Sequence, residues 1–184
     1  MTQFICISGQ AQHGKDTSAQ MLKEELTNRG YSVLVIHYAD LLKFICKNFF
    51  GWNGEKDERG RSLLQYVGTE CVRKKDPDYW VDFVANLVRM FPNKWDFVIV
   101  SDVRFPNELS RIADAGFPAT HVRIVRPGFD NQLTDAQKKH KSETALNGVA
   151  PDVWLMNTSM DELRVQINVL CDTFIEARKR GEME

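Results

Sequence analysis

Residues 9–17, GQAQHGKDT, constrain the fold of this chain more than any other stretch of it. Gly9, Gly14 and Lys15 have the spacing of a phosphate-binding loop, GxxxxGK. The loop follows a short apolar run, residues 4–8, and opens a helical pattern. Backbone N–H groups in such a turn point at the ligand, and the dipole of the following helix favours negative charge. The stretch therefore predicts a strand, a phosphate site and a helix in that order.

The loop supplies most of the candidate nucleotide-binding residues. Lys15 is a catalytic candidate because a lysine at this position reaches the β- and γ-phosphates as a mobile charge. His13 is interpreted as lining or shielding the loop, not as an acid–base catalyst. The full set of candidates from the loop is Gly9, Gln12, His13, Gly14, Lys15, Asp16 and Thr17.

Strand and helix patterns alternate along the rest of the chain. Buried strands are expected at 4–8, 32–38, 96–102, 120–125 and 153–156, and helices at about 15–28, 41–50, 62–75, 80–91, 106–115 and 159–177. This alternation predicts an α/β domain with a mainly parallel sheet. Its core comprises 1–39, 92–125 and 151–184. A helical insertion (40–91) and a polar segment (126–150) are expected over the carboxyl edge of the sheet, where such folds bind ligands.

Charge and composition exclude several classes of partner. The formal net charge of the 184 residues is −1, so no basic field favours nucleic acid. No apolar stretch reaches membrane-spanning length, and the four cysteines are scattered without metal-site spacing. We therefore expect a cytoplasmic protein with small-molecule substrates and neither nucleic-acid nor membrane partners.

Several motifs, taken in order, resemble one enzyme family. They are "GKDT", "YADLLK", "LLQYVGTECVRKKDPDYWV", "VIVSDVRFPNEL", "HKSETA" and "PDVWLMNTSMDEL". Together they resemble the phage-type deoxynucleoside monophosphate kinases, P-loop kinases related to adenylate kinase. The resemblance implies a three-layer P-loop kinase fold with a monophosphate-binding helical insertion at 40–91 and a lid at 126–150. It also implies ATP- and Mg²⁺-dependent phosphoryl transfer to a deoxynucleoside monophosphate (dNMP), in the host cytoplasm if the gene is viral.

Two carboxylates are candidate metal ligands. Asp102 ends an apolar strand beside the loop, a position from which a carboxylate can hold Mg²⁺. Asp16 stands where many phosphate loops carry a hydroxyl. Adenylate kinase relatives also lack a hydroxyl directly after the lysine and place threonine one residue later, as Thr17 is placed here. We hypothesise that Asp16 and Asp102 share the hydration shell of the metal. The competing interpretation makes Asp16 a helix-start residue favoured by the dipole.

Cations are expected to hold the acceptor. The resemblance implies that Arg104 binds substrate phosphate, and bidentate geometry favours arginine for that task. Arg126, at a strand exit, is the best-placed catalytic cation of the lid. Glu108 orients Arg104, contacts the nucleoside, or only starts a helix. The other candidates are Asp40, Lys43 and Arg73 near the acceptor phosphate, Gln65, Thr69 and Trp80 near its sugar or base, and Asn157 near the donor adenine.

Three questions stay open at this level. Trp80 lies on an amphipathic stripe, so core packing is an equal alternative to base stacking. Another small phosphate monoester, as in phosphomevalonate or dephospho-coenzyme A kinases, is a rival acceptor, and a nucleotide-binding module without turnover is a rival of another class. A homodimer formed through the helical insertion is also possible.

Overall fold

A computed structural model describes residues 1–55, 57–131, 133–134 and 138–181 of the chain. Its centre is one sheet in the order β2-β3-β1-β4-β5, and every neighbouring pair of strands is parallel. The strands are β1 (Gln3–Ser8), β2 (Val33–Ile36), β3 (Phe97–Val100), β4 (Ala119–Val125) and β5 (Val153–Met156). The predicted parallel sheet is thus confirmed. Because all strands run the same way, the loops that follow them meet at one edge.

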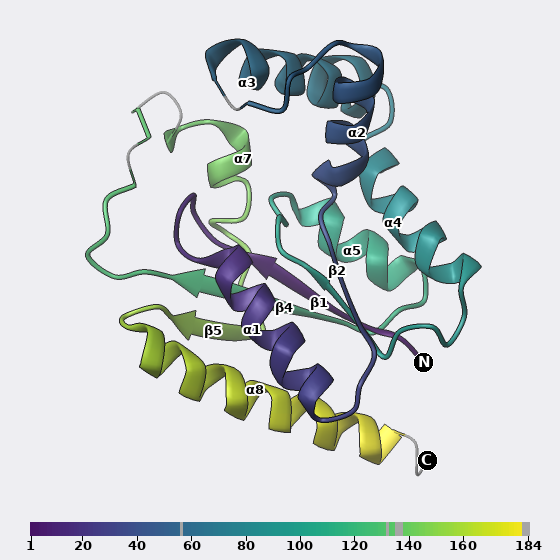
Figure 1. Cartoon of the computed structure of the whole chain (residues 1–184), viewed down its shortest axis with the longest axis vertical. Coiled ribbons are helices and arrows are strands. Elements are labelled where there is room, and N and C mark those ends of the chain that lie inside the picture. Colours follow the sequence, from purple (N-terminus) through teal and green to yellow (C-terminus); the bar gives the residue numbers. More distant parts are fainter. Residues whose placement is uncertain (56, 132, 135–137, 182–184) are drawn as a thin grey trace.

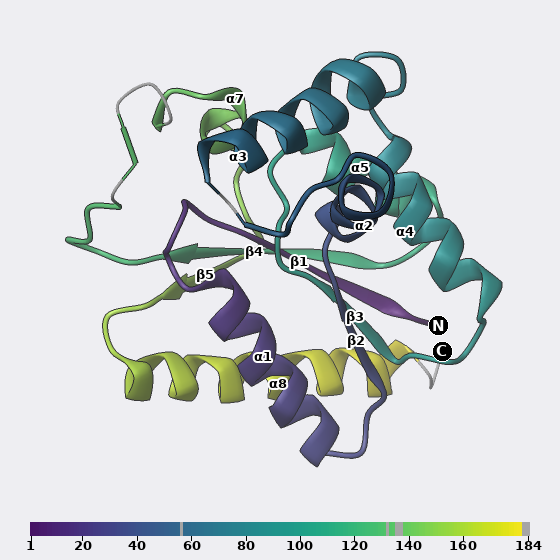
Figure 2. The same cartoon turned by 45° about the horizontal axis from the view of Figure 1, so that its top comes forward.

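Helices cover both faces of the sheet (Figures 1 and 2). On one face lie α1 (Lys15–Asn28) and α8 (Met160–Gly181), and on the other α4 (Tyr79–Met90) and α5 (Pro106–Asp114). Successive side chains of a strand point to opposite faces, so Ile5 and Ile7 of β1 pack in the core under α1 and α8. Phe4 and Cys6 pack in the core under α4 and α5. Two cores on either side of one sheet make the three layers that we expected.

The insertion stands above the carboxyl edge of the sheet (Figure 1) and has its own small core, built on Cys46, Trp52 and Val67. It contains α2 (Ala39–Phe49), α3 (Glu58–Gln65) and a π-helical segment, η1 (Tyr66–Arg73). The helix expected at 62–75 therefore starts earlier, because Asp57 accepts a hydrogen bond from Gly60 N and caps α3. Its second half widens into η1, a departure that apolar periodicity does not reveal. Wide turns of this kind are frequent at functional sites.

The beginning of α2 differs from the prediction. Asp40 does not precede the helix but lies in its first turn, where its carboxylate accepts a hydrogen bond from the His37 N–H (2.9 Å). The amides of Tyr38 and Ala39 are satisfied instead by Asp102, from the end of β3. The cap therefore comes from a residue more than sixty positions away, which local sequence rules do not identify.

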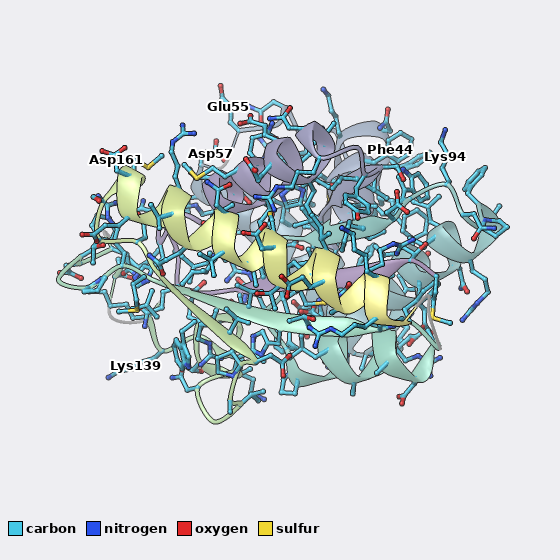
Figure 3. All side chains as sticks on the ribbon, turned by 90° about the horizontal axis from the view of Figure 1, so that it is seen from below. Phe44, Glu55, Asp57, Lys94, Lys139 and Asp161 are labelled. Carbon is cyan, nitrogen blue, oxygen red and sulfur yellow. The ribbon has the colours of Figure 1, made fainter. Side chains whose placement is uncertain are left out.

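The last helix also extends further than expected. α8 continues to Gly181, and Asp161 lies in its first turn (Figure 3). Near its other end, Arg178 donates to Asp96 (2.8 Å) and to the Met1 carbonyl (2.7 Å). These contacts lie beyond residue 177, where the helix was expected to end. Among the described residues, no helix is both long enough and apolar enough to cross a membrane.

Candidate functional site

The loop between β1 and α1 has a backbone that only glycine allows at two points. Gly9 has φ +149° and Gly14 has φ +98°, conformations that L side chains rarely adopt. A Cβ at Gly9 would lie 2.6 Å from the Ile124 carbonyl oxygen, and one at Gly14 would lie 2.5 Å from Asn157 Nδ2. The loop is therefore pressed against the ends of β4 and β5. This fit matches the cradle that a polyphosphate needs.

Lys15 folds back over this loop. Its Nζ donates to the carbonyl oxygens of Gly9 and Gln10, both at 2.9 Å. Burial, followed by the nearby charge of Arg104, lowers the pKa of Lys15 to about 8. An anion in the loop would stabilise the protonated lysine. The side chain is thus held where its protonated amine can attract phosphate oxygens, and where those oxygens would raise its pKa again.

His13 and Asn157 form the back of the loop. The His13 ring is buried, and its Nδ1 accepts a hydrogen bond from the Arg126 N–H at 3.1 Å. Burial, then the charges of Lys15 and Arg126, lower the pKa of His13. Asn157 Nδ2 donates to the His13 carbonyl at 3.0 Å. The guanidinium of Arg126 lies over the Phe129 ring, 4.2 Å from its centroid. Of the remaining loop candidates, Gln12 and Thr17 are exposed at the surface.

A chain of polar contacts runs from the loop to the insertion. Ser101 Oγ donates to Asp16 Oδ1 (2.7 Å), and His37 Nε2 lies 3.4 Å from the same oxygen. The other ring nitrogen of His37 lies 3.1 Å from Asp40, which also accepts from Lys43 Nζ (3.1 Å). Burial alone would raise the pKa of Asp16. The Ser101 hydrogen bond and the charge of His37 outweigh this effect, so the pKa is lowered. Asp16 is thus an ionised carboxylate. His37 lies in no quoted motif, and Ser101 lies in VIVSDVRFPNEL without an assigned role.

Asp102 has both carboxylate oxygens engaged. Oδ1 accepts from Tyr38 N at 2.8 Å and Oδ2 from Ala39 N at 3.0 Å, so Asp102 joins the insertion to the sheet. Its assignment to the metal stays a prediction. The described part of the chain contains no group of three or more histidine, cysteine, aspartate or glutamate side chains able to hold a metal ion. Mg²⁺ needs none when one or two carboxylates, water and substrate phosphates complete its shell.

The buried carboxylate of Glu108 accepts hydrogen bonds from two arginines, Arg73 and Arg104. Its side chain is only 2% exposed, and Oε1 accepts from Arg73 Nη2 at 2.9 Å. Oε2 accepts from the backbone N–H groups of Arg104 (2.7 Å) and Phe105 (3.0 Å) at the start of α5. Burial raises the pKa of Glu108, against the opposing charge of Arg73. Of its three possible roles, the geometry supports orientation and helix-start chemistry. Contact with a nucleoside is not supported, because the carboxylate faces inward.

The candidates for sugar and base separate into buried and exposed residues. Trp80 is 3% exposed, and its indole N–H donates to the Gly68 carbonyl at 3.2 Å. It belongs to the core, so we leave it out of the proposed site. Thr69 and Gln65 are exposed. Gln65 Nε2 lies 3.2 Å from His140 Nε2, a contact between the insertion and segment 126–150.

Segment 126–150 contributes an unexpected carboxylate. Its short helix α7 (Lys141–Thr144) carries Glu143, whose Oε2 accepts from the Ala11 N–H of the loop at 3.2 Å. The other carboxylate oxygen is paired with Arg104 Nη1, which also donates to the Ser142 carbonyl at 3.3 Å. Two cavities, of about 180 and 200 Å³, flank Glu143. The motif HKSETA includes this glutamate, but nothing in the sequence indicated its contacts with the loop and Arg104.

Segment 126–150 also carries three lysines, Lys138, Lys139 and Lys141. Lys139 is exposed and projects outward (Figure 3), and Lys141 is also exposed. Lys138 donates to Asp130 at 2.7 Å. Residues 132 and 135–137, which the lid prediction includes, lie outside the described residues.

Comparisons with known proteins identify a family for this chain. The model of the family described as deoxynucleotide monophosphate kinase matches residues 35–167. A protein of Acanthamoeba polyphaga mimivirus, with the proposed name deoxynucleotide monophosphate kinase, is 29% identical over 89% of this chain and 93% of its own.

Solved structures share the fold. One is the Mycobacterium tuberculosis APS kinase in complex with AMPPNP and APS (TM-score 0.51, 13% identity, 97% of this chain and 98% of that chain). Another is the cobyrinic acid a,c-diamide synthase of Mycobacterium smegmatis with bound ADP and magnesium (TM-score 0.53, 11% identity, 98% and 97%). At such identities the likeness concerns architecture, and kinases among these structures identify it as the P-loop α/β fold expected from the sequence.

Proposed function

We propose, from the premise that this chain belongs to the deoxynucleotide monophosphate kinase family, that it transfers the γ-phosphoryl group of ATP to a dNMP. The products are ADP and the deoxynucleoside diphosphate. One observation carries the proposal: a single carboxylate, Glu143, contacts both a loop amide and Arg104. A phosphoryl group uses the same kinds of donors, so a group of that size can lie between the loop and the arginine.

The donor side of the mechanism rests on the loop. Its amides and the start of α1 bind the polyphosphate, and Lys15 moves from the Gly9 and Gln10 carbonyls to the β- and γ-phosphates. Asp16, ionised and hydrogen-bonded to Ser101, would hold Mg²⁺ through its hydration shell, with Asp102, the residue after Ser101, as a further candidate ligand. When bound, Mg²⁺ supplies charge neutralisation between the β- and γ-phosphates. Two of the fold neighbours, with AMPPNP and with ADP and magnesium, support this choice of donor and metal.

The acceptor side rests on arginines that the fold already orients. Two arginines from different elements face the carboxyl edge of the sheet. The Arg73 guanidinium lies over the Phe105 ring, 4.4 Å from its centroid, and is paired with Glu108. Arg104 lies at the turn before α5, where its backbone N–H donates to Glu108. Lys43, which lies on the insertion like Arg73, is the third candidate cation. The second pKa of a phosphate monoester is about 6, so the acceptor is deprotonated near neutral pH and needs no general base. Catalysis then consists of positioning and charge neutralisation.

The division of the chain into parts belongs to the same proposal. The insertion, 40–91, receives the acceptor, and 126–150 closes over the donor to exclude water. A cytoplasmic location fits a reaction between ATP and a free nucleotide. Exposed aromatic rings on α2, among them Phe44 (57% exposed) and Phe49 (73% exposed), are the candidate contact of a homodimer. Figure 3 shows Phe44 on the surface of the insertion.

A coupled ADP-release assay tests the function. The purified protein is given ATP and Mg²⁺ with each of the four dNMPs, the corresponding ribonucleotides, phosphomevalonate or dephospho-coenzyme A. We expect turnover with at least one dNMP. Turnover with a non-nucleotide monoester alone would transfer the proposal to that substrate class. ATP binding without turnover on any acceptor would identify a binding module.

Replacing Arg104 with alanine should selectively impair use of the acceptor. The loss of one charged hydrogen-bonding group, worth about 1.5–3 kcal/mol, corresponds to a decrease of about 10- to 150-fold in kcat/KM for the dNMP. The KM for ATP should change much less. Steady-state kinetics with each substrate varied in turn measures both constants. Arg111→Ala is the matched control, since Arg111 is an exposed arginine of α5 paired with Asp82. Unaltered dNMP kinetics in Arg104→Ala would remove its assigned role.

A further inference from the structure

Glu143 is an acidic side chain inside a site built for anions. Its side chain is only 11% exposed, and its carboxylate lies between the phosphate loop and Arg104. Glutamate is rarely this buried unless it is paired. A polyphosphate in the loop would repel it at close range. The position of this negative charge therefore calls for an explanation that involves the anion site itself.

The partners of Glu143 are those that a phosphate oxygen would use. One oxygen accepts from a loop N–H, that of Ala11, and the other pairs with the guanidinium of Arg104. The Ser142 carbonyl accepts from the same Arg104 nitrogen at 3.3 Å. Arg104 is thus held by α7 through two adjacent residues. While it is held there, this nitrogen cannot also bind an acceptor phosphate.

We infer that Glu143 is a positioning residue that occupies the phosphate site as an internal anion and is displaced by donor polyphosphate, which releases Arg104 for the acceptor. The inference rests on the proposed function for the identity of the acceptor, but not for the displacement itself. Donor and carboxylate compete for the Ala11 amide, and like charges at this distance do not coexist. Arg104 therefore becomes available only after the donor has bound.

The displacement reaches the insertion through the start of α7. His140 precedes this helix, and its Nδ1 accepts from Ser142 N at 3.3 Å, while its Nε2 contacts Gln65 of α3 at 3.2 Å. Movement of Glu143 away from the loop carries this turn with it and breaks the Gln65 contact. Donor binding is thereby coupled to the part of the chain proposed to receive the acceptor.

The first test measures binding, not turnover. Glu143→Gln keeps the size of the side chain and removes its charge, so no ion pair opposes the incoming polyphosphate. Inorganic tripolyphosphate, titrated by calorimetry without acceptor, should bind at least about tenfold more tightly to Glu143→Gln than to the wild type. Glu143→Asp, which keeps the charge, should stay closer to the wild type. Glu176→Gln is the control for net charge, because Glu176 lies near the C-terminal end of α8, far from α7 (Figure 1). Equal or weaker binding by Glu143→Gln would overturn the inference.

The second test measures the order of binding. Calorimetry with a dNMP alone should show weak binding to the wild type that tightens when tripolyphosphate is present. In Glu143→Gln this dependence should shrink, because Arg104 is already free. A dependence as strong as that of the wild type would also overturn the inference. Tighter tripolyphosphate binding by Glu143→Gln in a protein that phosphorylates no dNMP would refute the proposed function alone. Normal dNMP turnover with unaltered tripolyphosphate binding would refute the role of Glu143 alone.

Discussion

Replacing Lys15 with alanine should lower kcat for phosphoryl transfer by about a hundredfold to a thousandfold. Its Nζ is the cation anchored within the loop itself, and removing one preorganised group that stabilises transition-state charge costs a factor of about 10²–10³. Stability should change little, since the hydrogen bonds of the amine go to carbonyl oxygens of the loop. Single-turnover assays and a urea titration measure the two quantities. Lys23→Ala, on the same helix, is the matched control. Near-normal turnover of Lys15→Ala would exclude the loop from the mechanism.

The same residue gives donor binding a dependence on pH. Burial and the charge of Arg104 lower the pKa of Lys15 to about 8 in the free protein. Only the protonated amine attracts phosphate, so tripolyphosphate affinity should be level below pH 8 and fall as the pH rises past it. Any titration of the ligand itself is common to all variants, so comparison with Lys15→Arg isolates the contribution of Lys15. Lys15→Arg stays charged and should abolish the decrease. A decrease that persists in Lys15→Arg would assign the titration to another group.

Replacing Glu108 with alanine should destabilise the protein by about 3–5 kcal/mol, the usual cost of removing one partner from a buried ion pair. The change strands Arg73, whose side chain is 20% exposed, and leaves the Arg104 and Phe105 amides without their acceptor. Urea denaturation followed by circular dichroism measures the free energy of unfolding.

Two variants sharpen that measurement. Glu108→Gln keeps an oxygen for the two amides and should lose less stability than Glu108→Ala. Glu70→Gln disrupts an exposed pair with Lys74 (3.8 Å) and should change stability by less than about 1 kcal/mol. If Glu108→Ala is as stable as Glu70→Gln, the carboxylate does not hold the acceptor arginines in place.

The elements near the phosphate loop were the most predictable part of the fold. The expected strand at 4–8 and helix at 15–28 differ from β1 and α1 by one residue at most, because turn chemistry and apolar periodicity act over a few neighbouring positions. The insertion was harder. The indole of Trp80 donates to the Gly68 carbonyl, and Gly68 packs against Leu42. These contacts join three helical segments, and no pattern within one of them indicates the others.

The amino-acid sequence by itself thus determined which residues form the phosphate loop, because the glycines and the lysine that such a loop needs lie within nine consecutive residues. Tertiary structure decided which charges meet around it. Glu143 reaches Ala11 across 132 positions, and Asp102 caps α2 across more than sixty. In sequence, Glu143 is one acidic residue of a polar segment, and the place of Asp102 at a strand end indicates an edge of the sheet but not a partner. Electrostatic pairing depends on distance in space, and only the parallel sheet, which gathers the ends of its strands at one edge, sets that distance.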